Sequence, residues 1–263
     1  MKTTTRYLVC MLTLALVAAT VSATPARAAS LSADVVVVVD SSGSMAQKVR
    51  EVQNGLNSFA GSITGAGVDL HLILIASSSS SGNGICVSTP LGSGICPDDQ
   101  NLPLYRHVVQ AVDGNSTLSI ILNTFNQWQG SMRPGASKEF LVVSDDDSSL
   151  SAANFNTGLL ALDAGLQGYR FNGIVASYSG GPFDPCSSIG TSGTQYLNLI
   201  NQTGGVLSNL CTGTVTSGLG AIAQGVIVNA SPVPVPAALW LFGSGLMGLA
   251  AVTRRRRTLS AVT

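Results

Sequence analysis

Five consecutive valines, Val35 to Val39, end a strand-like segment that begins at Ala33, and Asp40 follows at once. A run without alternating polar residues is typical of a strand buried on both faces of a parallel sheet. The next segment carries apolar residues at steps of four and three, which places them on one face of a helix. These residues are Met45, Val49, Val52, Leu56, Phe59 and Ile63.

The rest of the chain continues this alternation. Segments 68–76, 140–143, 170–177 and 206–207 are strand-like, and segments 117–128, 150–166, 194–201 and 214–227 have helical spacing. Alternating strands and helices predict an α/β fold: a doubly wound, mainly parallel six-stranded sheet with helices on both faces. Ligands of such sheets bind beyond the carboxyl ends of the strands. Two long loops, 77–103 and 178–192, interrupt the pattern, and loops of this length often serve a function.

The N-terminus has the features of a secretory signal peptide, predicted as residues 1–28. Lys2 and Arg6 precede an apolar run too short to span a membrane comfortably, and Ala26 to Ala28 form a small-x-small cleavage site. The alternative is a buried core helix.

The C-terminal part, residues 232–263, carries a second apolar run at 237–252, followed directly by Arg254 to Arg257. This run is short for a transmembrane segment, and the arginines would lie on the cytoplasmic side. The order of Pro234-Val235-Pro236, apolar helix and arginine cluster resembles the PEP-CTERM sorting signal, with Val235 where that signal usually has Glu. The resemblance implies a Gram-negative bacterium, an exosortase that removes the tail, and release to or attachment at the cell surface. A plain single-pass anchor is the alternative.

The charges are unevenly distributed along the chain. The two terminal segments contain seven basic residues and no acid, which leaves 6 basic and 13 acidic residues in the domain predicted at 29–231. An acidic domain gives no electrostatic support for binding nucleic acid.

Four cysteines remain after removal of the signal peptide, and an even count in an exported chain favours disulfides. Three pairings exist, and Cys86 with Cys96 and Cys186 with Cys211 is the simplest, because each bond then closes one loop. A cysteine metal site is the alternative. Against a metal site, the chain has no Cys-x-x-Cys motif, and His71 and His107 are its only histidines.

Acidic and hydroxyl side chains follow two of the predicted strands. Asp40, Ser42 and Ser44 come after the valine run, and Asp145 to Asp147 come after strand 140–143. If the strands are neighbours, the carboxylates converge, and they would repel one another without a cation between them. Hard oxygen ligands suit Mg²⁺, with Mn²⁺ or Ca²⁺ as alternatives. Helix capping by the serines and a solvated acidic turn are the competing interpretations.

Asp40-x-Ser42-x-Ser44 after an apolar strand, with Asp145 after a later strand, resembles the von Willebrand factor type A domain and its metal-ion-dependent adhesion site. The resemblance covers about residues 33–228 and implies that the hydroxyls and aspartates hold a cation at the top of the sheet. An open coordination position would accept a carboxylate from a partner. The third hydroxyl would come from Ser116, with Thr117 as the alternative, and Asp146 could replace Asp145.

These observations predict an exported binding module without enzymatic activity, whose metal captures a carboxylate of a protein or an acidic polysaccharide. A structural matrix protein with a stabilising metal is the alternative. A hydrolase is disfavoured, because the chain lacks a Gly-x-Ser-x-Gly or His-Glu-x-x-His motif and His107 is the sole candidate base.

Overall fold

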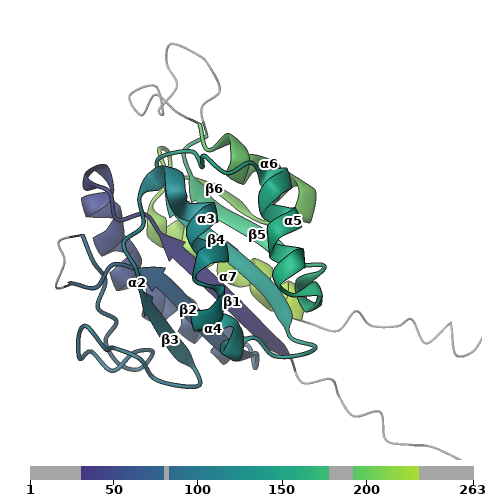
Figure 1. The fold of residues 1–263 in the computed structure, drawn as a ribbon. Coiled ribbons are helices and arrows are strands. Elements are labelled where there is room, and N and C mark those ends of the chain that lie inside the picture. Colours follow the sequence, from purple (N-terminus) through teal and green to yellow (C-terminus); the bar gives the residue numbers. More distant parts are fainter. Residues whose placement is uncertain (1–30, 80–82, 178–191, 231–263) are drawn as a thin grey trace, which may run out of the picture. The chain divides into compact units, whose positions relative to one another are not determined.

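Six strands form one parallel sheet in the computed structural model, which describes residues 31–79, 83–177 and 192–230 (Figure 1). The strands are β1 (Ser32–Val39), β2 (Asp69–Ala76), β3 (Tyr105–Val109), β4 (Ser137–Ser144), β5 (Arg170–Val175) and β6 (Leu207–Asn209). Their order across the sheet is β3-β2-β1-β4-β5-β6, which is that of a doubly wound fold. Every pair is parallel, so the expected fold class is confirmed.

Helices cover both faces of this sheet (Figure 1). The α-helices are α2 (Ala46–Gly65), α3 (Thr117–Asn123), α4 (Phe125–Trp128), α5 (Ala152–Leu162), α6 (Thr194–Thr203) and α7 (Val215–Ala230). Short 3-10 helices are η1 (Gly43–Met45), η3 (Gly114–Ser116), η4 (Gln129–Ser131) and η5 (Ala164–Leu166). Helices α2 and α7 pack on one face, and α3 to α6 pack on the other.

The valine run lies at the centre of both apolar cores. Val35, Val37 and Val39 belong to the core under α2 and α7, whereas Val36 and Val38 belong to the core under α3 to α6. All five are at most 1% exposed. A strand with partners on both edges and helices on both faces has no polar side, which explains the uninterrupted run of valines.

Three expectations need correction. Strand β3 was not predicted, because its sequence Tyr-Arg-His-Val-Val is not a continuous apolar run. The helix expected over 117–128 breaks at Thr124, whose hydroxyl donates to the Ile120 carbonyl. The helix expected over 150–166 ends at Leu162, and Asp163 caps η5 by accepting the Gly165 N–H.

The loop between β2 and β3 is held by specific contacts rather than being structureless. A disulfide joins Cys86 to Cys96, as predicted. Asp99 is fully buried, and its oxygens contact His107 Nδ1 at 2.6 Å and accept the Val87 N–H at 2.5 Å. The other ring nitrogen of His107 lies 3.2 Å from the Ala76 carbonyl. The buried contact between Asp99 and His107 therefore attaches the interior of the loop to the edge strand β3.

The predicted signal peptide, the tail and Cys186 lie outside the described residues. Cys211 is disulfide-bonded. Within residues 31–79, 83–177 and 192–230, no helix is both long and apolar enough to cross a membrane. The segment predicted to do so, 237–252, is not among them.

Candidate metal centre

Asp40 lies at the carboxyl end of β1, between the ends of β2 and β4. Its N–H donates to the Val143 carbonyl at 3.0 Å, which continues the pairing of β1 with β4 by one residue. Its side chain is fully buried, and Oδ1 accepts the Ser42 N–H at 2.8 Å. Asp40 therefore satisfies a turn amide, but that bond uses only one of its oxygens.

Ser144 and Tyr196, which no sequence pattern marked as site residues, complete the surroundings of Asp40. The hydroxyl of Ser144 donates to Oδ2 of Asp40 at 2.8 Å. Tyr196, fully buried on α6, donates its hydroxyl to the Gly114 carbonyl at 3.0 Å and interacts with Thr117 and Ser144. Burial first, and then the charges of Asp147 and Asp40, raise the pKa of Tyr196, so the phenol stays a neutral donor.

The three acids after β4 have different surroundings. Asp147 accepts a hydrogen bond of 2.8 Å from the N–H of Gln195, in the first turn of α6. It thereby gives a partner to one of the backbone N–H groups that have none within the helix. Asp145 and Asp146 instead lie beside Asp40, with one carboxylate oxygen of each within 4.8 Å of the others. Oδ1 of Asp145 is buried and has no hydrogen-bond partner among the described residues. A solvated acidic turn does not account for that atom.

The hydroxyls of Ser42 and Ser44 lie 3.2 Å apart at the entrance to η1. Ser42 is the N-cap of η1 and Met45 that of α2, and neither cap has a side-chain hydrogen bond. Capping therefore does not explain these two serines.

The turn before α3 approaches the same acids. A Cβ on Gly114 would lie 2.4 Å from Oδ2 of Asp146, so only glycine fits there without displacement. Ser116 donates its hydroxyl to the Asp113 carbonyl, and Thr117 donates its hydroxyl to the Gly114 carbonyl. Because both hydroxyls act as donors, both retain oxygen lone pairs for a cation, and the choice between them stays open.

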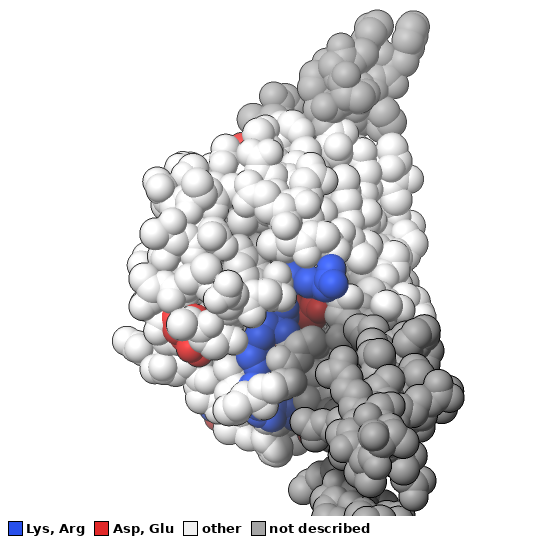
Figure 2. Space-filling view, turned by 90° about the vertical axis from the view of Figure 1, so that its right-hand side faces the viewer, with Lys and Arg blue, Asp and Glu red and all other residues white. Residues whose placement is uncertain are grey.

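Among the described residues, no basic side chain forms an ion pair that offsets the negative charges of the cluster. Burial raises the pKa of Asp40, hydrogen bonds from Ser42 and Ser144 lower it, and the charge of Asp145 raises it again. None of the ion pairs formed by the described lysines and arginines involves Asp40, Asp145 or Asp146. The face in Figure 2 shows the basic side chains gathered in one band, and most of its remaining described surface is uncharged.

The donor set fits a hard divalent cation. Oxygens on opposite sides of Ca²⁺ are about 4.6–5.2 Å apart, so carboxylate oxygens within 4.8 Å of one another can share that ion as they stand. Mg²⁺ spans at most about 4.2 Å, so any pair of oxygens farther apart than that must draw closer around it. The buried Oδ1 of Asp145 accepts no hydrogen bond from the described residues, so it is available to coordinate a cation. The other cluster of ligand-type side chains, Cys86, Cys96 and Asp99, contains the disulfide, so its sulfurs are not thiolate ligands.

Fold and site together define a doubly wound α/β domain with an acidic cluster at the carboxyl edge of its sheet. Residues 232–257 match the PEP-CTERM protein-sorting motif, which marks an exported chain with a C-terminal tail for sorting to the cell surface and processing by an exosortase. No curated protein matches the chain.

A similar solved structure is the pilus adhesin SpaC from Lactobacillus rhamnosus GG in its open conformation, with 19% sequence identity and a TM-score of 0.42. The match covers 75% of this chain and 30% of that one. The matched part of the present chain thus spans under a third of the length of SpaC.

Proposed function

We propose that this surface-sorted protein is a binding module that holds a divalent cation, with Mg²⁺ favoured, and captures a carboxylate-bearing partner. Oδ1 of Asp145 carries the proposal, because a buried carboxylate oxygen without a donor or cation is costly. Asp40 and Asp146 would share the ion, and hydroxyls of Ser42, Ser44 and either Ser116 or Thr117 would complete the set. The resemblance to the von Willebrand factor type A motif supports the same assignment.

The bound ion would supply a positive charge to which an acidic group of the partner attaches. The protein residues hold the carboxylates in place: Ser144 and the Ser42 N–H orient Asp40, and Gly114 leaves room for Asp146. Because the domain itself is acidic, recognition depends on the ion rather than on attraction between oppositely charged surfaces. The partner is a protein or an acidic polysaccharide.

A binding role is favoured over hydrolysis because both histidines are engaged elsewhere. His107 contacts Asp99 and the Ala76 carbonyl, and Nδ1 of His71 lies 2.9 Å from the Ser131 carbonyl. The hydroxyls of Ser42 and Ser44 are therefore without a histidine base.

Calorimetric titration of the full chain with Mg²⁺ and with Mn²⁺ tests the proposal. We expect saturable binding of one ion, lost in Asp145→Asn and kept in Asp98→Asn, which alters an exposed acid outside the cluster. Retention on immobilised polygalacturonate only in the presence of Mg²⁺ would support capture of a carboxylate. Ion binding that raises the melting temperature without such retention would favour the structural role, and absence of ion binding would refute the metal centre.

A further inference from the structure

The acidic cluster contains more negative charge than a divalent cation neutralises. One carboxylate oxygen each of Asp40, Asp145 and Asp146 lies within 4.8 Å of the other two. Three carboxylates around an ion with two positive charges leave one negative charge in excess. A partner's carboxylate would therefore approach a site that already repels it, although the proposed function requires its capture.

The number of ligands raises the same difficulty. The three carboxylates, together with the three hydroxyls of the proposed set, supply six oxygens, which is the number that octahedral Mg²⁺ holds. An oxygen of the partner must therefore replace one of them. Replacing a neutral hydroxyl would add a further negative charge, whereas replacing one carboxylate by another leaves the total charge unchanged. The exchange of an aspartate is thus electrostatically favoured.

Asp146 is the aspartate that the protein holds least firmly. Asp40 is buried, and the Ser42 N–H and the Ser144 hydroxyl donate to its two oxygens. Asp145 has its Oδ1 buried. The carboxylate of Asp146 is the most exposed of the three and accepts no hydrogen bond from the described residues. Its backbone N–H is held by the Ser144 hydroxyl at 3.1 Å, so the side chain can rotate away while the backbone stays in place.

The resting position of Asp146 is nevertheless defined. Its carboxylate lies against Gly114, where an added Cβ would be 2.4 Å from Oδ2. Gly114 begins η3, the turn that carries Ser116 and leads to Thr117, and these residues are the candidates for the third hydroxyl ligand. Asp146 is thus accommodated beside the turn that completes the metal centre.

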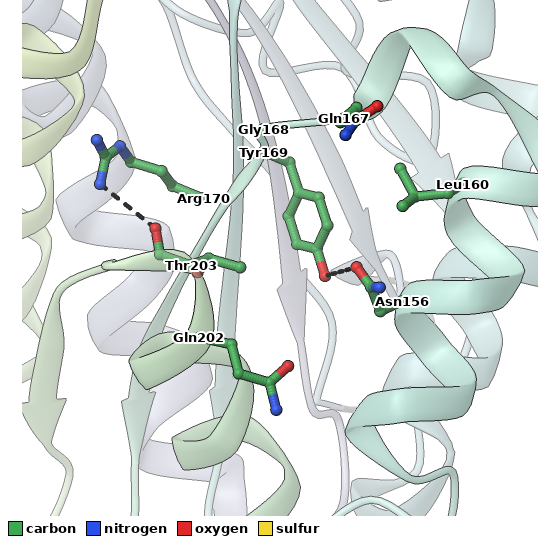
Figure 3. A pocket seen from close by; sticks show the side chains of 8 residues that line it. All are labelled: Asn156, Leu160, Gln167, Gly168, Tyr169, Arg170, Gln202 and Thr203. Atoms are coloured by element: carbon green, nitrogen blue, oxygen red, sulfur yellow. Dashed lines mark hydrogen bonds between the residues drawn. The ribbon is translucent and has the colours of Figure 1, made fainter.

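A pocket of about 390 Å³ at the amino end of β5 does not offer the carboxylate another place (Figure 3). Arg170 alone among its lining residues carries a charge, and Figure 3 shows the guanidinium on the opposite side of β5 from Tyr169 and Asn156. The lining also includes Gln202 and Thr203 at the end of α6, where the partial negative charge of a helix C-terminus disfavours an anion. Capture of a carboxylate therefore stays with the metal centre.

We propose that Asp146 is a built-in substitute for the partner's carboxylate: it binds the ion in the absence of the partner and leaves the ion when the partner's carboxylate replaces it. This inference rests on the proposed function and adds how the site is regulated. Because Asp146 is tethered beside the ion, its effective concentration is high, and isolated carboxylates in solution compete poorly with it. A partner has to add further contacts or present several carboxylates.

Water-proton relaxation with Mn²⁺ tests whether Asp146 occupies a position on the ion, because water bound directly to this paramagnetic ion relaxes faster. The full chain in a nonionic detergent, saturated with Mn²⁺, is compared with Asp146→Ala. Loss of the carboxylate should open a position that water fills, so the relaxation rate per bound ion should rise. The Mn²⁺ affinity should fall about tenfold or more.

Asp113→Ala is the matched control for the loss of a nearby negative charge. Asp113 is an exposed acid directly before η3, its side chain makes no capping hydrogen bond, and it lies outside the cluster. This variant should leave the relaxation rate per bound ion unchanged. Circular dichroism verifies that each variant keeps the fold.

Acetate measures the exchange, because Mn²⁺ broadens the methyl NMR signal of acetate that is bound to it. In the unaltered chain acetate must displace Asp146, whereas in Asp146→Ala it displaces only water. If Asp146 holds its position for about nine-tenths of the time, its removal should tighten acetate binding about tenfold. Asp146→Asn, which keeps the size of the side chain, should shift the affinity in the same direction. Acetamide, which is neutral, should compete poorly in all of these proteins.

Equal relaxation rates per bound ion in the unaltered chain and Asp146→Ala would overturn the proposal, as would equal affinities for acetate. Either result leaves the ion site intact, so the proposed function would stand. Absence of Mn²⁺ binding in the unaltered chain would instead refute the metal centre. Binding of Mn²⁺ without access of acetate in any of the proteins would refute carboxylate capture. In these last two cases the role of Asp146 falls together with the proposed function.

Discussion

The hydroxyl of Ser144, the last residue of β4, donates a 2.8 Å hydrogen bond to Oδ2 of Asp40, the residue that follows β1. The Ser42 N–H holds the other oxygen of the same carboxylate at 2.8 Å. Two neighbouring strands and one turn thus orient Asp40 without help from an ion. The cluster is preorganised, and an ion would need to order little more than the nearby hydroxyls.

Asp145→Asn should separate two effects of the unpartnered carboxylate: repulsion of the neighbouring acids when metal is absent, and ion binding when Mg²⁺ is present. Without metal, the variant should be at least as stable as the unaltered chain, because one of the converging negative charges is gone. With Mg²⁺ at about 100 times its dissociation constant, only the unaltered chain should gain about 2.7 kcal/mol, or about 5–10 °C in melting temperature. Thermal unfolding with Mg²⁺ and with EDTA measures both. An equal rise with Mg²⁺ in the two proteins would contradict the assignment of Asp145.

Gly114→Ala should weaken ion binding without touching a ligand. Its Cβ would lie 2.4 Å from Oδ2 and 2.5 Å from Cβ of Asp146, so the aspartate must move. Gly43→Ala is the matched control, because it lies in the turn after Asp40 with nothing within 4 Å of the added Cβ. Calorimetry should show a lower Mg²⁺ affinity only in Gly114→Ala. Similar affinities in both variants would show that Asp146 does not contribute.

Asp99→Ala should be strongly destabilising. It leaves the buried His107 ring and the Val87 N–H without their acceptor, and each buried polar group left unsatisfied costs about 1–3 kcal/mol. The adjacent Asp98→Ala alters an exposed acid and should change the free energy of unfolding by less than about 0.5 kcal/mol. Urea denaturation compares the two. Nearly equal midpoints would mean that the Asp99–His107 contact does not fasten the loop.

Glu139 should make stability depend on pH. Burial raises its pKa above 4.5, although Asn172, Asn229 and Arg170 lower it in part. The folded protein therefore binds this proton more tightly than the unfolded chain. The resulting stabilisation is complete below pH 4.5 and is lost as the pH rises through the raised pKa.

Unfolding of the unaltered chain and of Glu139→Gln, measured from below pH 4.5 to neutrality, tests this expectation. Over that interval the unaltered chain should lose stability relative to the variant. Asn229→Ala removes a hydrogen bond that lowers the pKa, so it should extend the loss to higher pH. Parallel stability curves for the unaltered chain and Glu139→Gln would contradict the raised pKa.

The central sheet could be predicted because its strands are buried on both faces. That burial leaves apolar runs such as 35–39, and helices between the runs imply parallel pairing. The edge strand β3 escaped prediction because it has a neighbour on one side only and contains Arg106 and His107. His107 is buried there only because Asp99, eight residues earlier, pairs with it, and a local pattern does not reveal such a contact.

The residues of the candidate site that directly follow a strand could be predicted from the sequence. Asp40 and Asp145 stand directly after apolar runs, and parallel strands place their carboxyl ends together. Ser144 could also have been predicted, because it is the polar residue between the apolar part of β4 and Asp145. Tyr196 had none, because it reaches the site from α6 by packing and spacing along the chain does not show this.

Asn229, in the last turn of α7, donates to Oε1 of Glu139 near the start of β4. The chain thus leaves the described domain, at Ala230, on the edge where the parallel strands begin. The sorting motif starts two residues later. A tether made through that motif would join the domain at the edge of the sheet opposite to the one that carries Asp40 and Asp145. Such a tether would give the domain a fixed orientation, in which it is held at one edge of the sheet and presents its acidic cluster at the other.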